Sequence, residues 1–166
     1  DSANDSDDEM GIIGSVGFAV GGMDAALSAI ITEEGDATDL TMANLILAGD
    51  SGDIAYAISA NYKESDPSGG SASNLWGVAL YAGTSVGTAD VDVRLDWIDD
   101  ENVLYSATDG ATEVWSVTVT ASWALVDGVD LRLEYRHDDA DDNLYADEAT
   151  TSDSLDTVQA QLVWHP

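Results

Sequence analysis

The chain has 166 residues, a length that suits one domain, and 45 % of them are apolar. Its charge is lopsided, because 33 Asp and Glu residues face only four Lys and Arg residues, for a formal net charge of -29. Such a surface excludes nucleic acid as a partner, since phosphates need basic side chains, and it disfavours anionic lipid headgroups unless divalent cations bridge the two. The absence of cysteine excludes disulfides and thiolate metal sites.

The acidity itself has two interpretations. One is solubility in a salty or cation-rich medium, and the other is attraction of cations to the mouth of a pore. No run of apolar residues reaches the 18 or more that a membrane helix needs. Membrane-spanning strands carry a weaker, alternating signal, so this observation leaves a membrane β-barrel open.

Nine segments are predicted as strands, because their apolar residues alternate with polar ones and no period near 3.6 is sustained. In chain order they are 11–20, 23–33, 39–48, 54–63, 74–85, 89–98, 113–125, 129–137 and 155–164. The first is rich in glycine. In the third, Asn44 interrupts the otherwise apolar face of Leu40, Met42, Ile46 and Ala48.

The alternation is clearest in the second half of the chain. In the segment 89–98 the apolar residues Val91, Val93, Leu95 and Trp97 alternate with Asp90, Asp92, Arg94 and Asp96. Successive side chains of a strand point to opposite faces, so one face is apolar and the other ionic. The segments 113–125, 129–137 and 155–164 repeat the pattern.

The connections alternate in length. Short turns rich in Gly and Asp lie at 21–22, 49–53, 86–88 and 126–128, and longer acidic or Ser/Gly-rich loops lie at 34–38, 64–73, 99–112 and 138–154. Up-and-down membrane barrels have this asymmetry, with short periplasmic turns and long extracellular loops. We therefore predict an all-β, up-and-down antiparallel transmembrane β-barrel of eight to nine strands, or part of a larger barrel.

Aromatic residues fall near the ends of the predicted strands, as in the interfacial girdles of membrane barrels. Trp115 and Trp123 share one apolar face and are separated by about 26 Å along the strand, which a tilt near 40° reduces to about 20 Å of membrane depth. The residues predicted for the girdles are Tyr62, Trp76, Trp97, Trp115 and Tyr135 at the loop end, and Trp123 and Trp164 at the turn end.

All four basic residues fall on polar strand faces and none in a loop. If this face lines a lumen, the residues lining the pore are Lys63, Asp90, Asp92, Arg94, Asp96, Asp130, Arg132, Glu134 and Arg136. Mixed charge of this kind sets ion selectivity in channels. The alternative is a sealed small barrel in which the charges pair across strands.

No catalytic constellation and no cofactor site is predicted. His137 and His165 lie far apart in sequence, no Gly-rich phosphate loop precedes a Lys-Ser/Thr pair, and we expect no enzyme. The acidic stretches 99–102 and 138–143 could bind calcium loosely, but neither has the spacing of an EF-hand loop.

The last hairpin resembles that of OmpL-like outer-membrane porins. The resemblance rests on residues 128–139, which include Arg-Leu-Glu-Tyr-Arg-His-Asp, on the closing strand 157–164, and on residues 114–128 with Trp-Ala-Leu-Val-Asp-Gly. It departs from the outer-membrane pattern at the end, where His165 and Pro166 follow Trp164. The resemblance implies a bacterial outer-membrane location, passive diffusion of small solutes and no catalytic residues.

The sequence thus favours an outer-membrane porin that passes ions and small solutes and prefers cations, with membrane lipid and solutes as partners and a homo-oligomer or a partner complex left open. One alternative is a small closed barrel that acts as an anchor, adhesin or scaffold. Another is a secreted acidic β-sandwich that binds calcium or a ligand.

The domain is taken as residues 1–166, either a whole barrel or its C-terminal portion, with residues 1–10 as an acidic loop or tail. Nine strands conflict with the even number usual in bacterial barrels. Either residues 1–22 are not a strand and eight strands close, or further strands precede Asp1 in a larger porin, which the loop-like composition of residues 1–9 favours.

Overall fold

A computed structural model describes residues 11–34, 38–67, 70–101, 112–147 and 150–165. Within these ranges, nine strands form one antiparallel sheet in the order β1-β2-β3-β4-β5-β6-β7-β8-β11, and β9 and β10 form a separate hairpin. The strands are β1 (Ile12–Val20), β2 (Met23–Glu34), β3 (Thr38–Ser51), β4 (Ile54–Pro67), β5 (Ser73–Val86), β6 (Ala89–Asp100), β7 (Thr112–Val126), β8 (Val129–Ala140), β9 (Tyr145–Asp147), β10 (Thr150–Ser152) and β11 (Ser154–Trp164).

The up-and-down antiparallel fold and all nine predicted strands are confirmed. The glycine-rich first segment is a strand, since β1 pairs with β2 from Ile12↔Ile31 to Val20↔Met23. The alternative in which residues 1–22 contribute no strand is therefore wrong. The sheet does not close on itself, because the described residues include no pairing between β1 and β11. No helix in the described part of the chain is long and apolar enough to cross a membrane.

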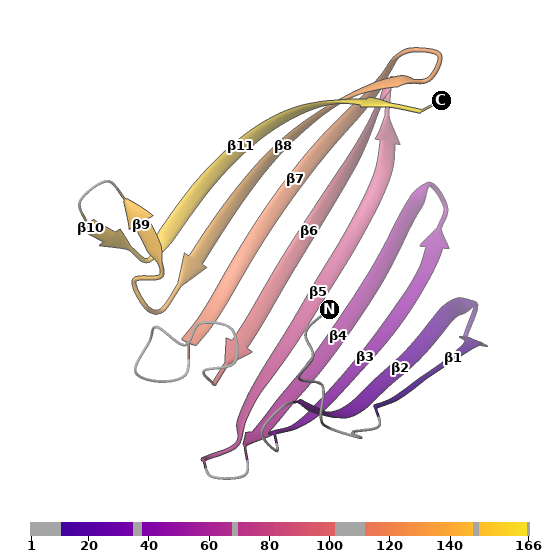
Figure 1. Cartoon of the computed structure of the whole chain (residues 1–166). Coiled ribbons are helices and arrows are strands. Elements are labelled where there is room, and N and C mark those ends of the chain that lie inside the picture. The colour runs from indigo at the N-terminus through magenta and orange to yellow at the C-terminus, as the bar shows by residue number, and fades with distance from the viewer. Residues whose placement is uncertain (1–10, 35–37, 68–69, 102–111, 148–149, 166) are drawn as a thin grey trace, which may run out of the picture.

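The sheet is strongly curved, and β1 and β11 lie at its two opposite edges (Figure 1). Along β7 the concave face is buried and the convex face exposed: Ser116 and Thr118 are 4 % and 8 % exposed, whereas Trp115, Val117 and Val119 are exposed. Residues that pair directly across antiparallel strands share a face. The register therefore assigns a face to each residue of the sheet.

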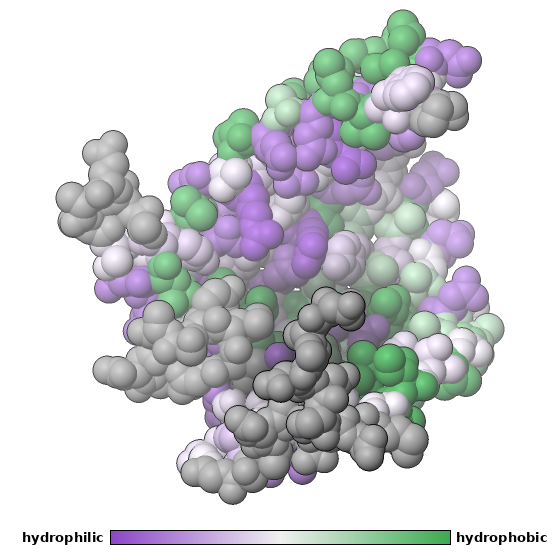
Figure 2. All heavy atoms as spheres, viewed as in Figure 1, coloured by the Kyte–Doolittle hydropathy of each residue, from purple (hydrophilic) through white to green (hydrophobic). Residues whose placement is uncertain are grey.

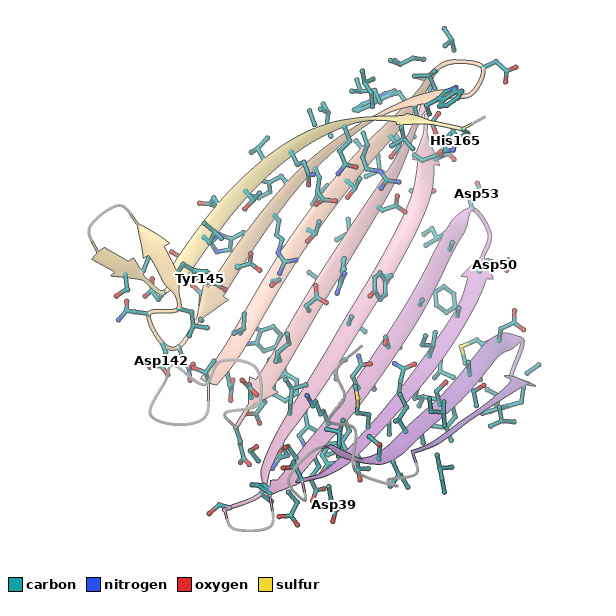
Figure 3. The ribbon with its side chains drawn as sticks, viewed as in Figure 1. Asp39, Asp50, Asp53, Asp142, Tyr145 and His165 are labelled. Atoms are coloured by element: carbon teal, nitrogen blue, oxygen red, sulfur yellow. The ribbon has the colours of Figure 1, made fainter. Side chains whose placement is uncertain are left out.

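Four two-residue turns join β1 to β2, β3 to β4, β5 to β6 and β7 to β8. Each contains glycine at positive φ, including Gly52 at 66°, Gly87 at 66° and Gly128 at 75°. Tight hairpins need this conformation, which glycine adopts without steric penalty. In Figure 3 the labelled Asp50, Asp53 and His165 lie at this turn end, and Asp39, Asp142 and Tyr145 lie at the opposite, loop end.

The strands run further toward the loop end than the sequence pattern predicted. β4 continues through Pro67 and β8 through Ala140, both into segments predicted as loops, and the predicted loop 138–154 also contains the β9–β10 hairpin. The predicted turn 49–53 is shorter than expected, because β3 continues to Ser51.

The concave face differs between the two halves of the sheet. On β3 it carries Leu40, Met42, Asn44, Ile46 and Ala48, because Asn44 pairs with Asn61 and Ile46 with Ser59 on the polar face of β4. The Nδ2 atom of Asn44 donates a hydrogen bond of 2.7 Å to Oδ1 of Asn61. Figure 2 shows hydrophobic side chains over β2 and β3 and hydrophilic ones over β6–β8.

Candidate functional site: the ionic concave face of β6, β7 and β8

The concave face of β6 and β8 carries two ladders of the same composition. Asp92, Arg94 and Asp96 succeed one another at every second position of β6, as Glu134, Arg136 and Asp138 do on β8. Both strands pair with β7, so the ladders lie in register across its hydroxyl side chains. The rows are Asp92–Thr120–Glu134, Arg94–Thr118–Arg136 and Asp96–Ser116–Asp138.

The central arginine of each ladder binds the aspartate on its loop side. Nη2 of Arg94 lies 2.6 Å from Oδ1 of Asp96, and Nη2 of Arg136 lies 2.7 Å from Oδ1 of Asp138. The carboxylates of both pairs are almost buried, at 10 % and 7 % side-chain exposure, while the arginines stay about half exposed. Burial of these carboxylates is tolerable because a guanidinium group compensates each one.

β7 links the two ladders through its hydroxyl groups. Ser116 donates a hydrogen bond to Oδ1 of Asp138 and accepts one of 3.2 Å from Nη2 of Arg136. Thr120 donates one of 3.0 Å to Oε2 of Glu134. The polar alternation of β7, which carries no charge of its own on this face, thus orders the charged strands on both sides.

The two ladders border a trough in the concave face, with a volume of about 410 Å³. One side consists of Thr118 and Thr120 with Glu134 and Arg136, and the other of small residues of β4 and β5 together with Tyr81. The guanidinium carbon of Arg94 lies 5.2 Å from the centre of the Tyr81 ring, a cation–π contact. The sequence pattern did not single out Tyr81, since the faces of the segment 74–85 are both largely apolar.

Eight of the nine residues predicted to line a pore lie on the concave face of β6 and β8. Besides the ladder residues, Asp90 shares a row with Arg132 across Ser122, and Asp130 lies one row nearer the turn. Ser85 donates a hydrogen bond of 2.6 Å to Asp90, and Nε2 of His165 lies 2.8 Å from Oδ2 of Asp130.

Lys63 is on the same face but lies apart from the ionic ladders. It pairs with Met42 on β3 and Leu75 on β5, and it borders a mainly apolar hollow of about 330 Å³. The structure therefore brings the three arginines into one ionic surface and leaves the lysine in the apolar half.

The convex face carries all seven residues predicted for the aromatic girdles. The loop-end rings are adjacent in pairs, with centroids 4.6 Å apart for Tyr62 and Trp76 and 6.2 Å for Trp97 and Trp115. Tyr135 shares this face, and Trp123 and Trp164 lie on it at the turn end, where they pair with Leu131 and Val129. Phe18 and Tyr56, which the sequence analysis did not assign to a girdle, share the convex face near the turns.

Two carboxylates of the acidic stretches considered for calcium accept hydrogen bonds from β7. Asp141 accepts a hydrogen bond of 2.8 Å from the backbone N–H of Glu113, and Asp142 accepts one of 2.8 Å from the hydroxyl of Thr112. Within the ranges that the structure describes, no group of three or more His, Asp or Glu side chains is placed to hold a metal ion. Asn102 and residues 103–111 lie outside those ranges.

The family model described as "Putative beta-barrel porin-2, OmpL-like" matches residues 6–165. This chain belongs to the OmpL-like β-barrel porin family. Neither a curated protein nor a solved structure shows a significant match.

The resemblance predicted from the last hairpin is thus confirmed and extends over nearly the whole chain. The family description names a β-barrel porin. The open, curved sheet therefore forms part of the wall of a porin-type barrel. Membership of this family accounts for its up-and-down topology and its ionic concave surface. A β-sandwich, the second alternative, would need two facing sheets, whereas the nine strands form one.

Proposed function

We propose that this OmpL-like porin is a passive diffusion channel of the bacterial outer membrane that passes ions and small solutes and prefers cations. The observation that carries the proposal is the charge balance of the concave face. On β6 and β8 this face has more carboxylates than guanidinium groups, namely Asp90, Asp92, Asp96, Asp100, Asp130, Glu134 and Asp138 against Arg94, Arg132 and Arg136. A lumen lined in this way concentrates cations and repels anions.

The opposite face supports a membrane location. Between the two aromatic girdles, β7 exposes Val117 and Val119 on the convex face, and neighbouring β6 exposes Val93 and Leu95. Exposed apolar side chains in a continuous band suit lipid chains rather than water. The acidic concave side and the apolar convex side then face the two solvents of a porin, water and lipid.

A sealed barrel that serves as an anchor is the competing function. It requires that the interior charges neutralise one another, and the pairs Arg94–Asp96 and Arg136–Asp138 meet this requirement. Asp92 does not, because it has no hydrogen-bond or ion-pair partner among the described residues. A carboxylate without a partner is stable in water but costly in a dry interior, which favours a water-filled lumen.

The edges of the sheet bear on the same choice. Neither β1 nor β11 has an outer strand partner among the described residues, and backbone groups at a lipid-exposed edge need one. We propose that the wall is completed, either by β1 pairing with β11 or by further strands beside each. Either arrangement contains at least nine strands, more than the eight whose interior side chains fill.

Reversal potentials across a salt gradient in planar bilayers test the proposal. We expect cation selectivity, a lower cation preference when Asp92 and Glu134 are replaced by Asn and Gln, and a higher one when Arg132 is replaced by Gln. Asp139→Asn is the matched control, because Asp139 lies on the convex face of the same strand as Glu134. Anion selectivity, or an equal effect of the convex control, would contradict the proposed lumen.

A further inference from the structure

An apolar row crosses the concave face in the half of the sheet away from the ionic ladders. Direct pairing places one residue from each of β1 to β5 side by side in this row, namely Ile13, Ile30, Met42, Lys63 and Leu75. Ile13 is 77 % exposed and Met42 is 36 % exposed, although the proposed lumen lies on this side of the sheet. Apolar side chains that are exposed together on such a face indicate a surface for an apolar ligand.

The middle of this row borders a hollow of about 330 Å³. Ile30, Met42 and Leu75 contribute to its lining. The volume lies at the lower end of the range for small-molecule sites, which is about 300–1,000 Å³. Methionine is unbranched and adapts to irregular neighbours, so Met42 suits a flexible ligand. The hollow therefore has the size and the lining of a site for one alkyl chain.

Lys63 supplies the only charge among the described residues that line the hollow. It is half-buried between Met42 and Leu75, and it has no hydrogen-bond or ion-pair partner among the described residues. Asp100, which continues the row beyond Leu75, is 1 % exposed and has an interaction of its own. An ammonium group beside apolar side chains loses part of its hydration, and a bound anion offsets that loss. The hollow thus offers one uncompensated positive charge to a ligand.

The amide side chains on the turn side of the hollow are bonded to one another. Nδ2 of Asn44 donates hydrogen bonds of 2.7 Å to Oδ1 of Asn61 and 3.2 Å to Oγ of Ser59. Nδ2 of Asn61 donates one of 3.4 Å to the same Ser59 hydroxyl. Both N–H groups of Asn44 are therefore occupied, and the charged group of a ligand is directed to Lys63.

The spacing of the strands sets the size of the ligand. Lys63 on β4 and Ile30 on β2 belong to the same row and are separated by β3. Strands lie about 4.8 Å apart, so these two backbone positions are about 10 Å apart. An alkyl chain of medium length whose head group contacts Lys63 can extend over Met42 as far as Ile30. Because the hollow offers a single positive charge, it suits a monoanion better than a dianion.

We propose that this hollow is a binding site for a medium-chain alkyl monocarboxylate, with the carboxylate at Lys63 and the alkyl chain on Met42 and Ile30. The inference rests on the proposed function in taking the concave face as the lumen, and it names a class of solute for a second part of that lumen. The site is separate from the ionic ladders, because the described residues that line the hollow include none of β6, β7 or β8. Burial of the alkyl chain supplements the ion pair, so an apolar anion can bind here although the ladders favour cations.

Calorimetric titration of the detergent-folded full chain with octanoate tests the proposal, after subtraction of the heat of octanoate added to protein-free micelles. We expect binding that weakens about fivefold in Lys63→Met, the loss typical of one partly exposed ion pair, and that is retained in Lys63→Arg. Arg132→Gln is the matched control, because Arg132 is also a basic residue of the concave face but does not line the hollow. It should leave the affinity unchanged, and heat-modifiable gel mobility checks that each variant folds.

A second variant and two further ligands separate the charge from the chain. Met42→Gln, which keeps the length of the side chain but makes it polar, should also weaken octanoate binding. Acetate, which lacks the alkyl chain, should not bind, and neutral octanamide should bind equally to the unmodified chain and to Lys63→Met. Absence of octanoate binding, full affinity in either Lys63→Met or Met42→Gln, or acetate binding as tight as that of octanoate would overturn the proposal.

The outcome is separable from that of the proposed function, because binding is measured without conductance. A cation-selective channel that does not bind octanoate refutes only the site. Octanoate binding that depends on Lys63, in a protein without conductance, refutes only the channel.

Discussion

Replacement of Val119 by arginine tests which face of the sheet meets lipid. Val119 is exposed on the convex face of β7, midway between Trp115 and Trp123. It lies four positions from each tryptophan, or about 13 Å along the strand, so the side chain lies near the bilayer midplane. A guanidinium group at that depth of a membrane barrel costs about 2–4 kcal/mol. The folding equilibrium should therefore fall roughly 30- to 700-fold.

Thr120→Arg is the matched control, because it introduces the same side chain one residue further along the same strand. Thr120 lies on the concave face between Asp92 and Glu134, whose carboxylates would attract the new charge. Chemical unfolding in lipid vesicles, with heat-modifiable mobility as the fold marker, measures both variants. We expect Val119→Arg to lose stability and Thr120→Arg to keep it within about 1 kcal/mol. Equal losses in the two variants would refute the assignment of the faces.

Further outcomes follow from the turns and from the ionic ladders. Gly52→Val should lower the urea midpoint of unfolding, because a β-branched residue at a φ of 66° is strained by about 1–3 kcal/mol. Gly14→Ala is the control, since Gly14 lies in an open position at ordinary φ, and it should leave the midpoint unchanged. Equal midpoints for the two variants would contradict the turn assignment. Asp138→Asn should destabilise the barrel by about 1–2 kcal/mol, because it removes the partner of the half-exposed Arg136. Asp139→Asn, on the convex face, is the control and should change stability by less than about 0.5 kcal/mol in the same unfolding assay. A neutral Asp138→Asn variant would show that Arg136 does not depend on this pair.

The strands could be predicted because several signals agree along the chain. The ionic segment 89–98 alternates cleanly, and its flanking Gly87 marks the turn, so both its position and its faces follow from the sequence. The strands were predicted too short at their loop ends. Near Pro67 and Ala140 both faces become polar, so the alternation disappears while backbone pairing continues.

The sequence could not predict which face of β3 lies on the concave side of the sheet. Both of its faces are largely apolar, so alternation carries no information, and the register with β4 decides that Ile46 faces inward. The alternation did not assign Tyr81 to the concave face for the same reason. The two ladders are visible in the sequence as acid-x-Arg-x-Asp at 92–96 and 134–138. Only the turn lengths and the register with β7 place their residues in the same rows across the sheet.

The central claim is that the concave face lines water and the convex face meets lipid. Single cysteines along β4 test it directly, because the chain contains no cysteine of its own. Positions 57, 59 and 61 lie on the concave face, and positions 58, 60 and 62 lie on the convex face. In protein folded into lipid vesicles, a membrane-impermeant cationic thiol reagent should label the first set quickly and the second set hardly at all. Uniform labelling along β4, or labelling of the convex set alone, would contradict the claim.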